Sequence, residues 1–225
     1  GDPELMTVKG ARLIREAHVV FVPTARVGQR SLARAISAPY IHPDQRVVEL
    51  EYPTDGRSKA SLEEYWTRSA DRIWLELGTA PCGVFLTEGD PMLYSTFIYT
   101  MDALRRRHPE IRFEIVPGVS SVNAAAAAMA LPLASGSQQL AILPADAPED
   151  VLRSTLNRAD TTVIVKMSAG GDVLINLLDD LGLVDQAVWI RHCSQPDQEI
   201  VRDVRELRNK RLDYFSLMIV KRHRP

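Results

Sequence analysis

Cysteine, aromatic residues and net charge are all scarce in this chain of 225 residues. It has 2 cysteines, 6% aromatic residues and a formal net charge of −2, while 45% of its residues are apolar and 25% are charged. A chain so close to neutral sets up no overall field that would attract nucleic acid or an anionic membrane. An acidic ligand must therefore be held by a local group of Arg and Lys. The apolar and charged fractions are those of a globular protein.

Several common functional motifs are missing as well. Cys82 and Cys193 stand far apart without metal-ligand spacing, so we expect free buried thiols in a reducing compartment and no metal site. There is no P-loop, no Gly-x-Gly-x-x-Gly and no Ser-His-Asp constellation. No run reaches the about 18 apolar residues that cross a bilayer, and charges at residues 9–16 interrupt any leader-like stretch. We expect a cytoplasmic protein.

Apolar periodicity alternates between strand-like and helix-like segments, which is the pattern of an α/β protein. A break at Pro117-Gly118 predicts an N-terminal lobe over residues 1–116 and a C-terminal lobe over 117–225. Strands are predicted over residues 19–22, 47–50, 82–86, 111–116, 139–143, 161–167, 187–192 and 215–220. Helices are predicted over residues 8–17, 31–36, 61–77, 122–130, 149–157, 173–181 and 204–207, and from Pro91 to about residue 107.

Local signals fix several of these boundaries. Thr7 suits the N-cap of the first helix, and Pro23 is expected to stop the first strand. Ser61 and Glu64 form a capping box, and Gly78 ends the helix that this box opens. The spacing predicts one buried face in each of two helices, formed by Val8, Ala11, Ile14 and Ala17 and by Leu93, Phe97, Met101 and Leu104.

The most informative stretch is Thr-Glu-Gly-Asp-Pro-Met-Leu-Tyr-Ser-Thr-Phe at residues 87–97. Gly89 permits backbone geometry closed to other residues, Asp90 suits an N-cap, and Pro91 suits the first helical position. Such a turn leaves N–H groups at the carboxyl end of a strand, where open α/β sheets bind small ligands. Ordinary helix initiation explains the same three residues, so further motifs must decide between the two interpretations.

Two further motifs accompany this one: Gly-Asp-Pro at residues 1–3 and Val-Pro-Gly-Val-Ser-Ser at residues 116–121. Together the three resemble the tetrapyrrole methylases, and the wording at 88–97 is most similar to the C20-methyltransferases of precorrin-2 or cobalt-factor II. The resemblance covers essentially the whole chain. It implies a two-lobed α/β fold, with a mixed sheet flanked by helices in each lobe, and a homodimer. Family members carry a strand before Gly-Asp-Pro, so we expect that strand to be missing here.

The resemblance also implies a methyl donor, S-adenosylmethionine, held in the cleft between the lobes largely by backbone groups. The residues that match its binding positions are Gly89, Asp90, Leu93, Ser120, Ser121, Met167 and Cys193. Each has a plainer interpretation from the residues alone. Leu93 and Met167 equally suit a core, and the two serines equally suit the cap of the following helix.

Methylation of a reduced tetrapyrrole carbon requires only a weak base to remove a proton afterwards. Tyr94 and Glu88 flank the glycine motif and are the nearest candidates, although Tyr94 also suits helix packing and Glu88 a helix terminus. The carboxylates of such a substrate call for cations. The candidate substrate-binding residues, which equally suit exposed surface, are Arg26, Arg30, Arg57 and Lys59.

Two rival functions remain open from the sequence. One is another enzyme of the same fold, such as a different corrin-ring methyltransferase, a diphthine synthase or a ribosomal-RNA methyltransferase. The lack of a basic stripe argues against an RNA substrate. The other rival is a non-catalytic tetrapyrrole-binding protein.

Overall fold

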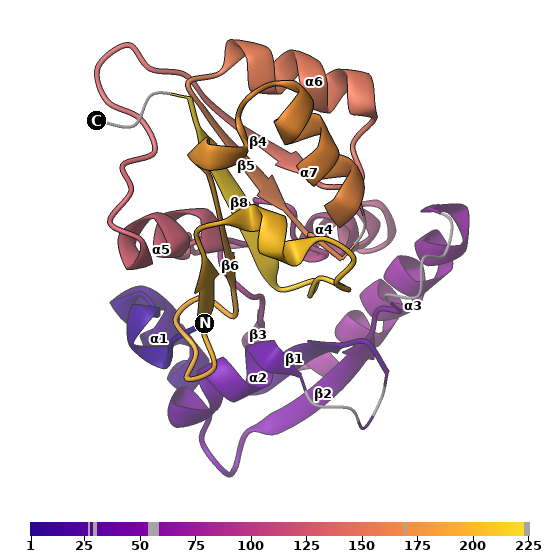
Figure 1. The fold of residues 1–225 in the computed structure, drawn as a ribbon. Coiled ribbons are helices and arrows are strands. Elements are labelled where there is room, and N and C mark those ends of the chain that lie inside the picture. The colour runs from indigo at the N-terminus through magenta and orange to yellow at the C-terminus, as the bar shows by residue number, and fades with distance from the viewer. Residues whose placement is uncertain (27, 29–30, 54–58, 169, 223–225) are drawn as a thin grey trace. The chain divides into compact units, whose positions relative to one another are not determined.

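The computed structural model describes the backbone of all residues except 27, 29–30, 54–58, 169 and 223–225, and the side chains of residues 59–61 lie outside the description as well. Contacts divide the chain into one unit over Gly1–Ser120 and a second over Ser121–Pro225. Each unit has a β-sheet of its own with helices beside it (Figure 1).

The sheet of the first unit has the strand order β2-β1-β3, with β1 (Val19–Thr24) between β2 (Arg46–Glu51) and β3 (Gly83–Phe85). Val19 pairs with Arg46 on one side and Gly83 on the other, and both pairings are parallel. The carboxyl ends of the three strands therefore lie at one edge of the sheet. The helical segments of this unit are η1 (Pro3–Leu5), α1 (Val8–Glu16), α2 (Leu32–Ser37), η2 (Ala38–Tyr40), α3 (Lys59–Leu77) and α4 (Phe97–Arg107).

Helices cover both faces of this sheet because β1 buries its residues alternately on either side. Val20 and Val22 pack in a cluster with Ile14 of α1 and Ala33 of α2. Val19 and Phe21 join a second cluster that contains buried residues of α3 and α4, namely Trp66, Ala70, Ile73, Ala103 and Leu104. This doubly covered parallel sheet confirms the α/β class predicted from the sequence.

The predicted helices α1 and α3 are both present, but some of their details differ from the prediction. Thr7 caps α1, since its hydroxyl accepts a hydrogen bond from the Gly10 N–H at 3.1 Å. Val8 does not belong to the buried face, because it is 88% exposed, whereas Ala11 and Ile14 are buried. The helix α3 begins at Lys59, so Ser61 lies inside it and is not the N-cap.

Pro23 does not stop the first strand, which continues to Thr24. Its neighbour two residues earlier, Phe21, accepts a hydrogen bond from Leu86 on the β3 side. The backbone nitrogen of Pro23 faces the same side, but β3 pairs only as far as Phe21. The missing N–H of Pro23 therefore costs no hydrogen bond between the strands. The Pro23 carbonyl instead accepts a hydrogen bond from the Ser31 hydroxyl at 2.7 Å.

Two further sequence predictions in this unit are wrong. Residues 111–116 form no strand, although Ile111 and Phe113 pack against the core of α3 and α4 as alternate residues of a strand would. The helix expected from Pro91 starts only at Phe97, so Leu93 lies outside its buried face. Tyr94, with φ of 51°, interrupts the first turn after Asp90.

The second unit contains a five-stranded mixed sheet in the order β4-β5-β8-β6-β7. The strands are β4 (Leu140–Pro144), β5 (Thr161–Val165), β6 (Ala187–Arg191), β7 (Glu199–Val201) and β8 (Ser216–Lys221). β4 is parallel to β5, and both β5 and β6 are antiparallel to β8. The strands β4, β5 and β6 therefore run in one direction, with their carboxyl ends at one edge. The short strand β7 escaped the sequence analysis.

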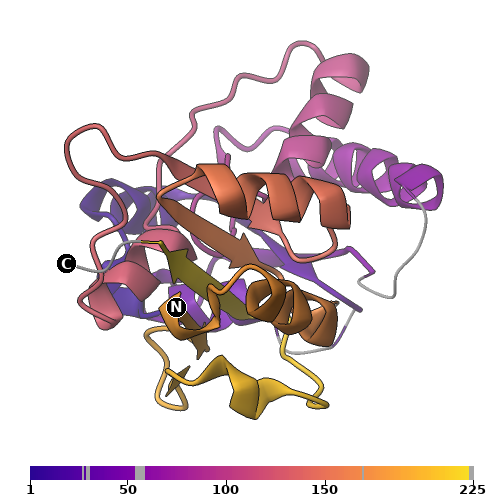
Figure 2. The same ribbon diagram turned by 45° about the horizontal axis from the view of Figure 1, so that its top comes forward.

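Helices again cover both faces of this second sheet. Figures 1 and 2 show α6 (Glu149–Arg158) and α7 (Gly171–Asp180) lying over it. Buried leucines of both helices pack with Ile164, Trp189 and Met218 on one face. On the other face, α5 (Ser121–Ala128) packs through Val122 and Ala125. Two single turns, η3 (Val184–Gln186) and η4 (Val204–Leu207), complete the unit. Within the described residues, no helix combines the length and apolar character needed to cross a membrane.

Candidate functional site

The bend after β3 is built around Gly89 and Asp90. Gly89 has φ of 67°, in the left-handed region that favours glycine. One carboxylate oxygen of Asp90 accepts a hydrogen bond from the Met92 N–H at 2.8 Å. The Asp90 carbonyl accepts another from the Leu93 N–H at 3.3 Å. Asp90 therefore caps a turn and not a helix, so its predicted role as a helix N-cap is wrong, because α4 begins only at Phe97.

The other carboxylate oxygen of Asp90 reaches the second motif of the first unit. Asp90 Oδ2 accepts a hydrogen bond from the Gly118 N–H at 3.0 Å. The two backbones come so close that a Cβ placed on Gly118 would lie 2.2 Å from the Gly89 carbonyl oxygen. Two motifs that are far apart in the sequence thus form one junction, which we call the Gly89–Gly118 junction. Gly118 was not among the predicted site residues, although its place in Val-Pro-Gly-Val-Ser-Ser was a signal.

The residues after Asp90 face solvent. Leu93 is 37% exposed and Tyr94 is 42% exposed. Tyr94 also has a positive φ, a conformation that non-glycine residues adopt rarely and often at functional sites. The backbone strain at Tyr94 marks this loop as more than a helix start.

Glu88 precedes the bend and reaches the N-terminus of α2. Its carboxylate oxygen Oε1 accepts a hydrogen bond from the Ala33 N–H at 3.1 Å. Removal of the carboxyl group from water raises the pKa of Glu88, and the hydrogen bonds to backbone N–H groups oppose this shift only in part. Glu88 is therefore a carboxyl group at the N-terminus of α2 whose surroundings raise its pKa.

Of the four candidate cations, the structure describes Arg26 and the backbone of Lys59. Arg26 follows β1 and is exposed, and the Thr24 hydroxyl donates to its carbonyl at 2.8 Å. Arg30 and Arg57 lie outside the described residues. Lys59 is the first residue of α3, and its side chain is not described. Arg26 follows the carboxyl end of β1 and the glycine bend follows the carboxyl end of β3, so both lie at one edge of this parallel sheet.

The predicted residues at the start of the second unit occupy different environments. Ser120 is buried, whereas Ser121 is the exposed first residue of α5. Met167 is fully buried, with 0% exposure, in the cluster formed by α6 and α7. A ligand at this position would therefore meet the backbone of residue 167 and not its side chain. Cys193 follows β6, is partly buried and packs against the α5 cluster.

The carboxyl edge of the second sheet also carries strained backbone. Lys166, one residue after β5, has φ of 60°, and His192 and Ser194, just after β6, have φ of 47° and 62°. Met167 and Cys193 are the immediate neighbours of these residues. Non-glycine residues in such conformations cluster at ligand sites, so the strain marks the turns that carry the two predicted donor-binding residues.

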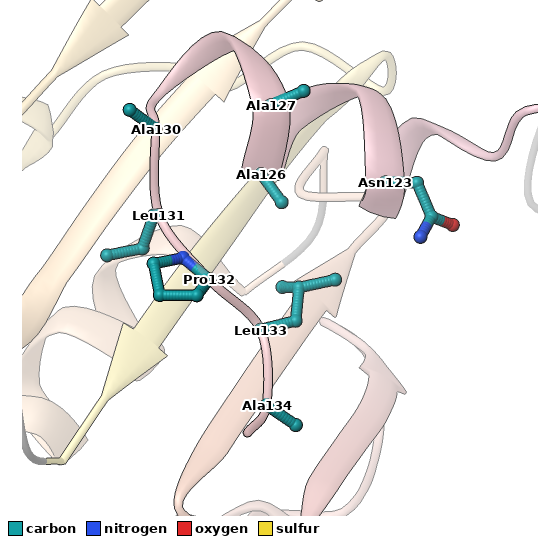
Figure 3. Close-up of a pocket in the computed structure, with 8 residues that line it drawn as sticks. All are labelled: Asn123, Ala126, Ala127, Ala130, Leu131, Pro132, Leu133 and Ala134. Atoms are coloured by element: carbon teal, nitrogen blue, oxygen red, sulfur yellow. The ribbon is translucent and has the colours of Figure 1, made fainter. Parts of the chain in front are cut away.

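A shallow groove of the second unit is lined by a different part of the sequence from these turns. Figure 3 shows its wall, formed by one side of α5 and the segment that follows, with Asn123, Ala126, Ala127 and residues 130–134 lining it. None of the predicted site residues lines this groove. Among the residues with described side chains, no three His, Cys, Asp or Glu come together in a way that would hold a metal ion.

Comparison with known proteins decides the family. The sequence model of the tetrapyrrole (corrin/porphyrin) methylases matches residues 1–207. The chain belongs to this family. Among solved structures, the cobalt precorrin-4 methyltransferase CbiF superimposes with a TM-score of 0.71 at 25% identity, over 98% of this chain and 90% of that one. The two-lobed tetrapyrrole methylase fold predicted from the sequence is therefore confirmed.

Curated tetrapyrrole methylases resemble the chain over nearly its whole length. The cobalamin biosynthesis protein CobIJ of Mycobacterium bovis is 36% identical over 227 residues, which cover 98% of this chain and 44% of that protein. The chain thus spans less than half the length of this relative. The cobalt-precorrin-2 C(20)-methyltransferase of Salmonella typhimurium is 33% identical over 223 residues, covering 98% of this chain and 92% of that enzyme.

Proposed function

We propose that the chain is an S-adenosylmethionine-dependent C-methyltransferase that methylates C20 of precorrin-2, or of its cobalt-containing counterpart cobalt-factor II, in cobalamin biosynthesis. The coarser part of this statement, a tetrapyrrole methyltransferase of the cobalamin pathway, follows from the family and from its curated members. The choice of C20 is supported by the Salmonella enzyme, which aligns almost end to end, and by the Tyr-Ser-Thr-Phe wording after the glycine bend.

The methyl donor is S-adenosylmethionine, because the tetrapyrrole methylases use it. The observation that carries this assignment to particular residues is the Gly89–Gly118 junction. The backbone of Gly118 packs directly against the Gly89 carbonyl there, so a side chain at position 118 would displace the bend, and the contact fixes the path of the bend. We propose that Gly89, Asp90 and Leu93 of the first unit, Ser120 and Ser121 at the division of the chain, and Met167 and Cys193 of the second unit serve one donor.

S-adenosylmethionine supplies a methyl group that is already activated by its sulfonium. The protein must orient the acceptor, exclude water and take up one proton after transfer. Glu88 suits the last task, since its raised pKa makes it a better base than an ordinary carboxylate. Tyr94 is the second candidate, exposed on the same loop.

The acceptor carries several carboxylates, which cations can hold through charge-assisted hydrogen bonds. We propose that Arg26, Arg30, Arg57 and Lys59 supply these cations. The loop of Arg26 is tied in place by two contacts: the Thr24 hydroxyl donates to the Arg26 carbonyl, and the Gly28 N–H donates to Glu49 Oε2 at 2.8 Å. Fixed loop ends reduce the conformational entropy lost on binding.

Two experiments test the proposal in sequence. Isothermal titration measures binding of S-adenosylmethionine and S-adenosylhomocysteine to the purified protein, and failure of both to bind would refute the donor assignment. Incubation with labelled donor and either precorrin-2, cobalt-factor II or a later corrin precursor then shows which product carries the label. Label at another ring carbon would leave the family function intact and overturn C20. Binding of both ligands without any labelled product would favour a tetrapyrrole-binding protein.

The base is tested with Glu88→Gln and Tyr94→Phe. If Glu88 takes up the proton, Glu88→Gln loses turnover but keeps its affinity for S-adenosylhomocysteine, since the glutamine oxygen can still accept from Ala33. Tyr94→Phe then keeps most of its turnover. The reverse result would assign the proton to Tyr94.

We also propose that the protein is a cytoplasmic homodimer, on the resemblance to its family alone. Sedimentation velocity over a range of concentrations would show a species of twice the mass of 25.1 kDa. A monomer that turns over normally would contradict the dimer and leave the catalytic proposal unaffected.

A further inference from the structure

The turn after β6 holds two residues in the left-handed region although neither is glycine. His192 has φ of 47° and Ser194 has φ of 62°, and Cys193 lies between them. A residue with a Cβ adopts this conformation rarely and keeps it only where the surrounding structure imposes it. A specific set of contacts must therefore hold the turn.

The His192 ring makes the main side-chain contacts of the turn. Its Nδ1 lies 2.6 Å from Asp197 Oδ2, and its Nε2 lies 3.2 Å from Asp213 Oδ2. Both partners are carboxylates, which accept hydrogen bonds but do not donate them when ionised, so each ring nitrogen of His192 faces an acceptor. The hydrogen bond from His192 is the main cause that lowers the pKa of Asp197.

The two carboxylates come from different segments of the chain. Asp197 lies in the loop between β6 and β7, and Asp213 lies in the segment that leads into β8, the strand next to β6. The backbone supports the same arrangement, because the His192 N–H donates to the Phe215 carbonyl at 3.0 Å. One side chain thus joins both segments to the turn that carries Cys193.

We propose that His192 is a positioning residue of the methyl-donor site, which by joining Asp197 to Asp213 holds the turn around Cys193 in its donor-binding conformation. This inference rests on the proposed function, in which Cys193 contacts S-adenosylmethionine. His192 has no chemical part in methyl transfer. Its loss should therefore weaken binding of the donor without removing any group that the chemistry needs.

Three variants test this role. His192→Ala removes the hydrogen bond to Asp197 and the contact with Asp213. His192→Asn keeps an amide donor close to the position of Nδ1, and asparagine tolerates the left-handed conformation better than most residues. The control is His42→Ala, which removes an exposed histidine paired with Asp44 at 3.4 Å in the first unit. Isothermal titration with S-adenosylhomocysteine and thermal unfolding are measured on the wild-type chain and on each variant, together with KM for S-adenosylmethionine and kcat.

We expect His192→Ala to bind S-adenosylhomocysteine about tenfold more weakly or worse, since small displacements of a binding group are costly. KM for the donor should rise while kcat at saturating donor changes little, His192→Asn should lie between His192→Ala and wild type, and His42→Ala should match wild type. Unchanged affinity in a folded His192→Ala overturns the inference, as does unchanged affinity in His192→Asn should His192→Ala fail to fold. Wild-type protein that binds no S-adenosylhomocysteine would instead overturn the proposed function.

Discussion

Gly118 occupies a position where a side chain would overlap the backbone of the glycine bend. The Cβ of Gly118→Ala would lie 2.2 Å from the Gly89 carbonyl oxygen and 3.0 Å from its carbonyl carbon, so the two segments must separate. We expect an overpacking cost of about 1–3 kcal/mol in the free energy of unfolding. Because the bend itself moves, we also expect loss of S-adenosylhomocysteine binding. Urea unfolding and isothermal titration measure the two effects.

Gly136→Ala is the matched control for Gly118→Ala. Gly136 has φ of 58° and open space around it, so alanine there is strained but not crowded, at a cost of about 1–2 kcal/mol. Both variants should lose stability, but only Gly118→Ala should lose ligand binding. Equal binding in the two variants would show that the junction does not shape the donor site.

The stability of the protein should depend on pH through Glu88, because the pKa of this residue lies above its usual value of 4.5. The folded protein keeps a proton on Glu88 where the unfolded chain has already lost it, so this group makes folding less favourable as the pH rises above about 4.5. Glu88→Gln lacks that dependence. We therefore expect the stability of Glu88→Gln relative to wild type to increase between about pH 4.5 and pH 7, measured by urea unfolding of both proteins at each pH.

Glu114→Gln is the control, because the pKa of Glu114 is lowered and its effect on stability should change with pH in the opposite direction. The hydrogen bond from Lys9 lowers the pKa of Glu114, so its contribution is present above its usual pKa and disappears as the pH falls. Wild type should therefore gain stability relative to Glu114→Gln as the pH rises. If the free energy of unfolding changes with pH in the same way in wild type and Glu88→Gln, then burial does not raise the pKa of Glu88.

Secondary-structure elements were predictable where a local rule acts without competition. Thr7 and Ser31 cap α1 and α2 through their hydroxyls, and Gly78 ends α3 with φ of 49°. The errors have long-range causes. Pro23 is tolerated because β3 ends before it. Asp90 caps a turn that is then diverted, because its second carboxylate oxygen binds Gly118 and Tyr94 takes a positive φ.

The candidate site was predictable only as far as its motifs extend. The glycine bend and the serines were found from motif wording, but the role of Gly118 depends on a contact across 28 residues that no local pattern reveals. His192 was not singled out either, because its two partners lie on separate segments. Residues that act through tertiary contacts need the fold before their role can be seen.

The end of β2 is tied to α4 by a buried hydroxyl pair. Tyr52 Oη and Thr100 Oγ1 lie 2.8 Å apart, and burial raises the pKa of Tyr52 to about 12. Tyr52→Phe would remove the hydrogen bond between this hydroxyl and the buried Thr100 hydroxyl, which should lower the free energy of unfolding by about 1–3 kcal/mol. We expect a lower midpoint of urea unfolding for this variant.

Tyr99→Phe is the control on the same helix. Tyr99 stacks on Trp66 at 4.2 Å between ring centroids and is 43% exposed, so its ring contact survives the change and its hydroxyl can be replaced by water. A loss of stability in Tyr99→Phe equal to that in Tyr52→Phe would show that the buried pair contributes nothing beyond the ring.

At the scale of the whole molecule, each unit presents the carboxyl edge of its own sheet as a candidate binding edge. The first carries the glycine bend and Arg26, and the second carries the strained turns at Lys166 and His192. Parallel strands explain both placements, since their carboxyl ends gather loops from distant parts of the sequence. If one donor contacts both edges, its binding must stabilise both units together.

Three tryptophans allow this to be measured unit by unit. Trp66 and Trp74 lie in the first unit and Trp189 in the second. Trp189→Phe therefore reports unfolding of the first unit by fluorescence, and the double variant Trp66→Phe, Trp74→Phe reports the second. Trp189 Nε1 is buried without a hydrogen-bond partner among the described residues, so phenylalanine there removes an unsatisfied group.

Binding of S-adenosylhomocysteine at 100 times its dissociation constant raises the free energy of unfolding of the unit that binds it by about 2.7 kcal/mol. We expect the ligand to raise the unfolding midpoint in both reporter proteins, because the residues proposed to bind it come from both units. A rise in only one of them would assign the donor to that unit alone and remove the other unit's residues from the site.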